Sequence, residues 1–238
     1  MIPVGNRPIL DYIVEALVQN GIKDIIMVVG YRKDTILSHF EDGRRFGARI
    51  MYVAQDKQLG TAPALSLAAR HLTGEDFLTV AGDNLIDAQL VADLLAKRKG
   101  PSMVVTESEI PAKYGVVQII DGRINNIIEK PEVRVGNIIN TGVYYFKSGI
   151  LDLFLEQKFD MELGITQVLA PVISRLDFTA VKTKGKWIDA VYPWDLPNIN
   201  SSALEFHGQG INGTVENGVT IRGPVSVGKG SRIRSGSY

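Results

Sequence analysis

The chain has 238 residues, and its 26 basic residues balance its 26 acidic ones, which gives no support for a nucleic-acid or membrane-surface partner. It contains no cysteine, so disulfides and thiolate metal sites are excluded, and its apolar stretches are far shorter than the ~20 residues that span a bilayer. No signal peptide is visible, and the three histidines (His39, His71 and His207) are scattered, which argues against a His-rich metal site. We therefore expect a cytoplasmic protein.

The first half of the chain alternates between helical and strand-like segments. Residues 9–20 carry an apolar stripe at helical spacing, which is entered through a Pro- and Gly-containing turn at 3–8 and closed by Gly21. Further helices are predicted at 33–43, 60–72 and 87–100, and short apolar strands at 24–31, 48–55, 76–83 and 102–108. This alternation predicts an α/β domain with a mixed, mostly parallel sheet.

The second half changes rhythm. Asp121-Gly122 stands between two apolar runs within residues 114–131, which is a strong hairpin signal. Strand-like pieces are predicted at 141–146 and 178–191, the latter broken by a Lys-Gly turn, and helices at 149–157 and 164–174. We expect this half to be an α+β extension laid on the first sheet rather than an independent domain.

The C-terminal tail has a six-residue period. Val215, Ile221, Val227 and Ile233 recur at this spacing, with Gly, Asn and Ser between them. Such a period is typical of a parallel β-helix, which needs several stacked turns to bury its core. Because the sequence ends at Tyr238, we expect the tail to be the beginning of a longer domain.

Polar residues follow several predicted strands, where ligands of open α/β sheets bind. Asp83 is well placed there to hold a hard cation such as Mg²⁺, although an aspartate at this position equally suits a helix cap. After another strand, Gly60 would let a ligand approach the backbone, and Thr61 could cap the next helix. Gln55 offers an amide that could read a base edge.

Later motifs add further polar groups. Glu129-Lys130-Pro131 places a carboxylate suited to sugar hydroxyls beside an ammonium suited to phosphate, and it equally suits a surface ion pair. Asn140, in Asn-Thr-Gly, offers an amide but also fits a common turn. Asp189 is a second carboxylate, and Asp195 is expected to be a helix cap.

The order of these motifs resembles the sugar-1-phosphate nucleotidylyltransferase family over nearly the whole chain. The family includes glucose-1-phosphate uridylyl- and thymidylyltransferases and bifunctional N-acetylglucosamine-1-phosphate uridylyltransferases with an acetyltransferase β-helix. Trp187-Ile188-Asp189 and Pro193-Trp194-Asp195 look most like archaeal members. The resemblance implies a Rossmann-like nucleotidyltransferase domain over residues 1–205 and the start of a left-handed, hexapeptide-repeat β-helix at 206–238.

The resemblance also implies a reaction. A nucleoside triphosphate (UTP or dTTP) and a sugar 1-phosphate (glucose 1-phosphate or N-acetylglucosamine 1-phosphate) would give a nucleotide-sugar and pyrophosphate. Asp83 and Asp189 would hold Mg²⁺, with Lys130 on the sugar phosphate as the third catalytic residue. The nucleotide would meet Gln55, Gly60 and Thr61, and the sugar would meet Gly115, Glu129 and Asn140. A homo-oligomer is compatible with the resemblance, since β-helix domains often trimerise.

The N-terminus departs from the family pattern. In the family, the motif matched by residues 3–8 follows a first strand and a Gly-rich loop that carries an Arg and a Lys, and neither is present here. We therefore expect a fragment, or a start assigned to an internal Met, which would leave the chain itself inactive. The alternative is a non-catalytic regulatory or assembly subunit, against which the retained Asp83, Glu129, Lys130 and Asp189 argue. A Rossmann-type oxidoreductase is excluded because no G-x-G-x-x-G follows a strand. The preferred nucleotide and sugar, and a C-terminal acetyltransferase activity, stay open.

Overall fold

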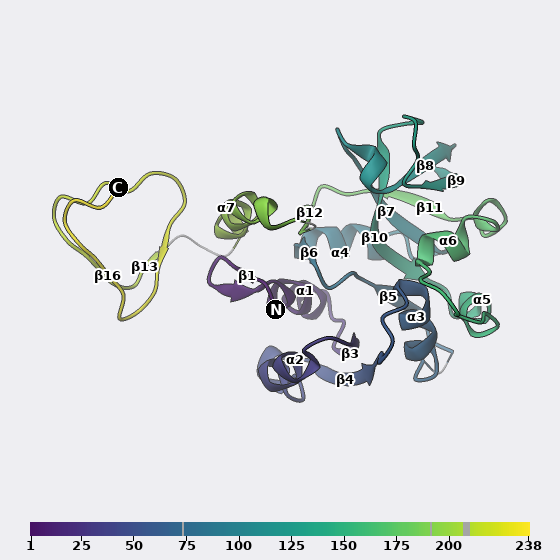
Figure 1. Ribbon diagram of the computed structural model, residues 1–238, viewed down its shortest axis with the longest axis horizontal. Helices are drawn as coiled ribbons and strands as arrows, with labels where there is room; N and C mark the ends of the chain where they lie inside the picture. Colours follow the sequence, from purple (N-terminus) through teal and green to yellow (C-terminus); the bar gives the residue numbers. More distant parts are fainter. Residues whose placement is uncertain (73, 191, 207–209) are drawn as a thin grey trace.

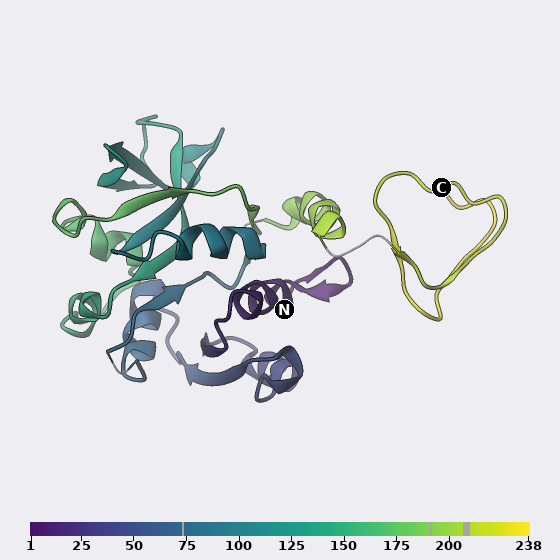
Figure 2. The same cartoon turned by 180° about the vertical axis from the view of Figure 1, so that it is seen from behind.

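The computed structural model describes residues 1–72, 74–190, 192–206 and 210–238, so His207 lies outside the described residues. Its main part is a mixed sheet with helices on both faces. Helices α3, α5 and α6 lie on the face seen in Figure 1, and α4 lies on the face seen in Figure 2. No helix in the described part of the chain is long and apolar enough to cross a membrane.

The predicted helices all form, with shorter bounds in several cases. The helices are α1 (Ile9–Gln19), α2 (Lys33–Phe40), α3 (Thr61–Ala69), α4 (Ala88–Leu95), α5 (Asp152–Leu155), α6 (Ile165–Leu169) and α7 (Leu196–Phe206), the last of which was expected only through the helix cap at Asp195. Short 3-10 helices are η1 (Arg44–Phe46), η2 (Pro111–Lys113), η3 (Ser148–Leu151), η4 (Ile173–Arg175) and η5 (Pro193–Asp195).

The strands of the α/β part are β1 (Pro3–Val4), β2 (Arg7–Pro8), β3 (Asp24–Val29), β4 (Arg49–Ala54), β5 (Phe77–Thr79), β6 (Asn84–Ile86), β7 (Ser102–Glu107), β8 (Gly115–Ile120), β9 (Arg123–Glu129), β10 (Ile138–Phe146), β11 (Thr179–Lys182) and β12 (Trp187–Asp189). The expected N-terminal turn is therefore a small β1–β2 hairpin around Gly5 and Asn6, both of which have positive φ. The predicted strand at 76–83 ends at Thr79, and a separate strand, β6, follows it.

The prediction of a mostly parallel sheet is wrong. The main sheet has the order β5-β10-β7-β11-β9-β8, and β7–β11 is its only parallel pair among the described strands, while β3–β4 forms a separate parallel pair. The cause is β10, which lies between β5 and β7 and runs antiparallel to both. The sheet is therefore mixed, since an inserted strand separates neighbours that point the same way.

Alternation along the central strands explains how the sheet is covered on both faces. On β7, Met103 and Val105 join the apolar cluster under α3, α5 and α6, whereas Val104 joins the cluster under α1 and α4. On β10, Tyr144 and Phe146 face the first cluster, and Tyr145 faces the second. The hairpin prediction is confirmed: β8 and β9 pair across Asp121 and Gly122, whose φ angles of 49° and 77° suit the tight turn that such hairpins prefer.

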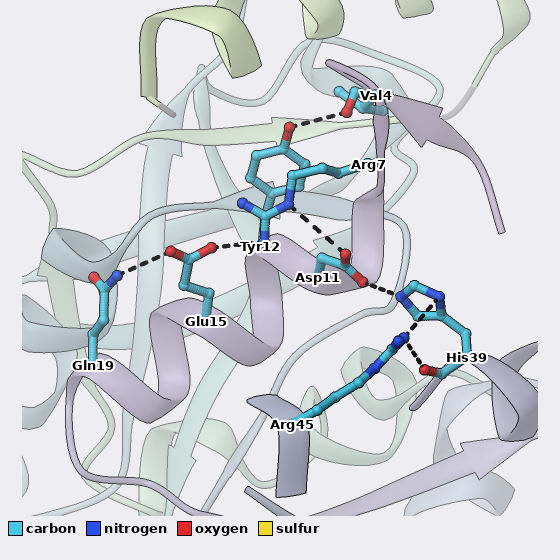
Figure 3. A network of polar contacts seen from close by, with 8 residues as sticks. All are labelled: Val4, Arg7, Asp11, Tyr12, Glu15, Gln19, His39 and Arg45. Atoms are coloured by element: carbon cyan, nitrogen blue, oxygen red, sulfur yellow. Dashed lines mark hydrogen bonds and ion pairs between the residues drawn. The ribbon is translucent and has the colours of Figure 1, made fainter. Parts of the chain in front are cut away.

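A polar network joins α1 to α2 and is drawn in Figure 3. Asp11, 6% exposed, lies 2.6 Å from Nε2 of His39 and 3.8 Å from Nε of Arg7. Arg45 approaches Nδ1 of His39 at 3.3 Å, and a guanidinium can only donate, so Nδ1 accepts and Nε2–H donates to Asp11. The buried carboxylate thereby holds α2 against the start of α1.

The C-terminal segment lies beyond α7 at one end of the molecule (Figure 1). Its strands β13 (Gly210–Ile211), β14 (Thr214–Val215), β15 (Ser226–Val227) and β16 (Arg232–Ile233) form the parallel pairs β13–β15 and β14–β16. Val215 pairs with Ile233, so two positions of the six-residue repeat lie side by side. A left-handed β-helix and a domain boundary between residues 205 and 206 stay predictions.

Candidate active site

Two carboxylates predicted from distant motifs meet on a small two-stranded sheet. Strand β6 pairs antiparallel with β12, which places Asp189 opposite Asn84. Asp83 directly precedes β6, and its carbonyl accepts the N–H of Ala190 at 3.1 Å. Backbone pairing therefore brings Asp83 and Asp189, here called the carboxylate pair, to the same end of this ladder.

One buried amide fixes the carboxylate pair. Asn84 is 2% exposed, and its Nδ2 donates to Oδ1 of Asp189 at 3.2 Å and to Oδ1 of Asp83 at 3.4 Å. Its Oδ1 accepts from the indole N–H of Trp187 at 3.1 Å. The sequence interpretation missed this role of Asn84, for which its place directly after a strand-end aspartate was the available signal.

The electrostatics of the pair favour a cation. Burial, followed by the charges of Asp83 and Asp195, raises the pKa of Asp189 from 3.8 to about 6, and burial also raises the pKa of Asp83. No group of three or more His, Cys, Asp or Glu that could hold a metal is found in the described ranges. Mg²⁺, however, is usually held by one or two carboxylates together with substrate phosphates, so two neighbouring carboxylates fit it.

The alternative reading of Asp83 as a helix cap is wrong. Helix α4 is capped by Asp87, whose Oδ1 accepts the N–H of Leu90 at 2.9 Å. Asp195 was expected to cap a helix, and it caps the 3-10 helix η5, of which it is the last residue. Its Oδ2 accepts the N–H of Tyr192, the N-cap residue, at 2.9 Å. The side chain of Asp83 therefore does not cap α4 and belongs to the carboxylate pair.

A second set of predicted residues gathers around Thr166, at the start of α6. Gly115 pairs with Glu129 across β8 and β9, and a Cβ on Gly115 would lie 3.0 Å from Oε2 of Glu129 and 3.1 Å from Cγ2 of Thr166. Burial raises the pKa of Glu129, opposed by the charge of Lys130 and a hydrogen bond with Thr166. We call Gly115, Glu129, Asn140 and Thr166 the Thr166 cluster.

Asn140 belongs to this cluster and is 8% exposed. Its Nδ2 donates to the hydroxyls of Tyr144 and Thr166, the latter at 3.2 Å, and its Oδ1 accepts the N–H of Gly142 at 2.9 Å. Asn140 lies within β10 at an irregularity in the pairing with β7. Its bond to the N–H of Gly142, whose φ is 76°, is an Asx-turn, so the alternative reading of Asn-Thr-Gly as a turn is confirmed inside the strand. No sequence signal marked Thr166, because its partners come from other strands.

Tyr114 links the carboxylate pair to the Thr166 cluster. Its carbonyl accepts the N–H of Lys130 at 3.0 Å, and its ring meets Trp187 edge-on, with ring centres 5.8 Å apart. Burial, followed by the charges of Asp189 and Asp195, raises the pKa of Tyr114. Lys130 itself has φ 43°, a left-handed conformation that turns the chain at the end of β9.

The predicted nucleotide loop has a different local structure from the one expected. Gly60, not Thr61, is the N-cap of α3, and the hydroxyl of Thr61 accepts the N–H of Ile165 at 2.9 Å, at the start of α6. Gly60 has φ 93°, and a Cβ there would lie 2.5 Å from the carbonyl oxygen of Leu163. The close approach that Gly60 allows is therefore to this chain's own backbone.

Gln55 lies at the carboxyl end of β4 and lines a surface depression of about 270 Å³. The other lining residues are Val29, Gly30, Tyr31, Lys33, Asp56 and Gln58. The Nε2 of Gln55 donates to the carbonyl of Gly60 at 3.0 Å. The loop is thus joined to Gln55 at one end and, through Thr61, to the residue before Thr166 at the other.

Known proteins resemble the chain in sequence. The Bifunctional protein GlmU of Methanococcus maripaludis strain C7 is 31% identical over 98% of this chain, which spans 56% of that relative. The Glucose-1-phosphate thymidylyltransferase of Streptomyces antibioticus is 30% identical over 98% of this chain and 68% of that relative. The chain therefore spans little more than half the length of the first of these proteins.

Solved structures resemble it in fold. A crystal structure described as a glucose-1-phosphate thymidylyltransferase from Bacillus anthracis in complex with sucrose has a TM-score of 0.79 and 26% identity, covering 88% of this chain and 87% of that one. A UDP-glucose pyrophosphorylase complexed with UDP-glucose has a TM-score of 0.74 and 21% identity, covering 86% and 89%, which supports the fold alone. The nucleotidyl transferase family model matches residues 1–203. The sequence resemblance is thereby confirmed, and the chain belongs to the nucleotidyl transferase family.

Proposed function

We propose that this protein transfers a nucleotidyl group from a nucleoside triphosphate, UTP or dTTP, to a sugar 1-phosphate and releases pyrophosphate. The acceptor would be glucose 1-phosphate or N-acetylglucosamine 1-phosphate. The observation that carries the proposal is the meeting of Asp83, directly before β6, with Asp189 on β12. Tyr114 links this pair to the cluster that contains Glu129 and Asn140. The names of the relatives, which include a thymidylyltransferase and GlmU, support the same class of reaction.

The reaction needs positioning and charge neutralisation rather than a covalent enzyme intermediate. A phosphate oxygen of the sugar 1-phosphate attacks the α-phosphorus, and the bond from that phosphorus to the bridging oxygen breaks as pyrophosphate leaves. Mg²⁺ bound by Asp83 and Asp189 would neutralise phosphate charge when present. Lys130 would face the sugar phosphate, and its ammonium would offset negative phosphate charge there.

The remaining residues would bind the two substrates. Glu129, whose carboxylate lies beside Gly115, would accept hydrogen bonds from sugar hydroxyls, and Gly115 would leave that carboxylate uncrowded, since a Cβ there would lie 3.0 Å from its Oε2. Asn140 has its amide engaged within the protein, so we assign it to holding Thr166 in place. Gln55 would form hydrogen bonds with the base. Gly60 and Thr61 would hold the loop between β4 and α3 in place beside Gln55.

Two further parts of the proposal concern the rest of the protein. The parallel pairs β13–β15 and β14–β16 support residues 210–238 as the beginning of a parallel β-helix. A homo-oligomer built through such a segment, and a cytoplasmic location, stay predictions.

Pyrophosphate release tests the proposal. The chain, extended at its N-terminus by the strand and Gly-rich loop that precede residues 3–8 in the family, is incubated with Mg²⁺, UTP or dTTP, and each sugar 1-phosphate. The binding of UDP-glucose and dTDP-glucose is measured by calorimetry. We expect turnover with one pair, reduced on the order of 10³-fold by Asp83→Asn or Asp189→Asn and unchanged by Asp152→Asn, an exposed aspartate of α5. Binding without turnover would favour the non-catalytic subunit instead, and the absence of both would overturn the proposal.

A further inference from the structure

Two short 3-10 helices from distant parts of the chain touch through a cation and a ring. The Nζ of Lys113, at the end of η2, lies 4.5 Å from the centre of the Tyr192 ring, which directly precedes η5. The Tyr192 ring is in turn stacked on Trp194, with centres 4.6 Å apart and planes inclined by 12°. Trp194 is 69% exposed, so the stack lies at the surface.

Each of these helices adjoins one half of the candidate site. Helix η2 runs directly into Tyr114 and Gly115, and the carbonyl of Tyr114 accepts the N–H of Lys130. Helix η5 follows Asp189 on the other side, and its Asp195 holds the N–H of Tyr192. A change in the distance between Lys113 and Tyr192 would therefore change the spacing of the Thr166 cluster and the carboxylate pair.

Besides the apolar cluster that packs Ile86 of β6 and Trp187 of β12 against Val104 of β7, side chains join the two segments directly. Within the described ranges, no hydrogen bond is found between residues 111–114 and residues 187–195. Tyr114 meets Trp187 edge-on, and the charges of Asp189 and Asp195 also act on its hydroxyl. A lysine over an aromatic face is attracted by the charge distribution of the ring, and stacking on Trp194 restricts where the Tyr192 ring can go. The cation–π contact is thus positioned to act as a latch.

We propose that Lys113 and Tyr192 are positioning residues that latch the sugar-binding half of the site to the carboxylate pair, with Trp194 supporting the Tyr192 ring. This inference rests on the proposed function. A ligand that reaches both halves, such as a nucleotide-sugar, would need the latch, whereas a nucleoside triphosphate that lacks the sugar would not. The difference between the two ligands separates a positioning role from general stabilisation.

The test compares the affinities of UDP-glucose and UTP by calorimetry, with Mg²⁺ present. Lys113→Gln and Tyr192→Leu should each lower the affinity for UDP-glucose about two- to fivefold, which is the range of an exposed cation–π contact. The affinity for UTP should stay unchanged. The double variant should be no weaker than either single one, because both remove the same contact. Lys113→Arg and Tyr192→Phe, which keep the charge and the ring, should bind like the wild type, as should Lys97→Gln, an exposed lysine after α4.

A second readout needs no ligand. The chain has two tryptophans, so the indole N–H signal of Trp194 can be assigned in an NMR spectrum by its loss in Trp194→Phe. Lys113→Gln should shift that signal, and Lys97→Gln should not. An unmoved Trp194 signal, additive losses in the double variant, or equal weakening of UDP-glucose and UTP would each overturn the latch, whereas a wild-type chain that binds neither ligand would overturn the proposed function.

Discussion

Replacing Asp189 by Asn should stabilise the protein in a pH-dependent way. The pKa of Asp189 lies at about 6 in the folded chain against 3.8 as its ordinary value, because burial and the charge of Asp83 disfavour its ionised form. The folded state therefore binds more protons than the unfolded state between about pH 3.8 and 6, so the free energy of unfolding falls as pH rises through this window. Above about pH 6 Asp189 is ionised in the folded chain, and the full loss in the free energy of unfolding that its ionisation causes is present.

The size of the effect follows from the shift. Each pKa unit is worth about 1.4 kcal/mol, so a rise from 3.8 to about 6 corresponds to about 3 kcal/mol as a ceiling. Asp189 is only partly buried, and solvent screening reduces this to about 1–2 kcal/mol. The introduced asparagine would keep an oxygen for the amide of Asn84, so little should be lost in exchange.

The assay is urea unfolding of wild type and Asp189→Asn at several pH values from about 4 to 8, with Asp152→Asn as the exposed control. The variant should gain about 1–2 kcal/mol at about pH 8, gain little at about pH 4, and lose nucleotidyl transfer. Added Mg²⁺ should stabilise the wild type more than the variant above about pH 6, since the cation relieves the same repulsion. A difference that is constant across pH, or one that favours the wild type at the alkaline end, would refute the reasoning.

Three further substitutions test other parts of the structure. Thr166→Val keeps the shape of the side chain but removes the hydroxyl beside Asn140. It should lower the free energy of unfolding in urea by about 1 kcal/mol, and it should lower the affinity for UDP-glucose more than the affinity for UTP. Gly60→Ala should cost more than about 2 kcal/mol because its Cβ would meet Leu163, whereas Gly21→Ala, also at positive φ but in open space, should cost about 1 kcal/mol; equal losses would exclude the contact as the cause. His39→Ala should cost about 2 kcal/mol by leaving the buried Asp11 short of a hydrogen-bond partner (Figure 3), and a loss below about 0.5 kcal/mol would show that the network contributes little.

Local signals in the sequence predicted the elements that local physics determines. The Asp121-Gly122 turn and the apolar stripe of α1 depend on neighbours within a few residues, and both are confirmed. The antiparallel pairs that β10 makes with β5, β7 and β8 depend instead on where β10 inserts, which no local pattern encodes. The same reason explains why the alternation of strands and helices predicted the layers correctly and the sheet incorrectly.

The candidate site divides in the same way. Asp83 and Asp189 were found because carboxylates at strand ends stand out in a sequence, and the structure brings them together through the β6–β12 ladder. Thr61 was assigned to its own helix, since a threonine before an apolar run is a common cap, but its hydroxyl serves α6 instead. Thr166 and Asn84 act through partners from other strands, so their roles emerge only after the chain has folded.

The backbone holds each half of the site together more firmly than it holds the two halves to each other. The carboxylate pair lies on paired strands and is bridged by the buried Asn84, and Glu129 and Gly115 face each other within the β8–β9 hairpin. Backbone pairing therefore holds each half together, whereas the two halves are joined by side-chain contacts of Tyr114 and Lys113 and by the apolar cluster that packs Trp187 on the main sheet. Under the proposed function, in-line transfer would depend on the distance between a phosphate held by one half and a sugar held by the other, so these side-chain contacts would influence the reaction more than their modest contribution to stability implies.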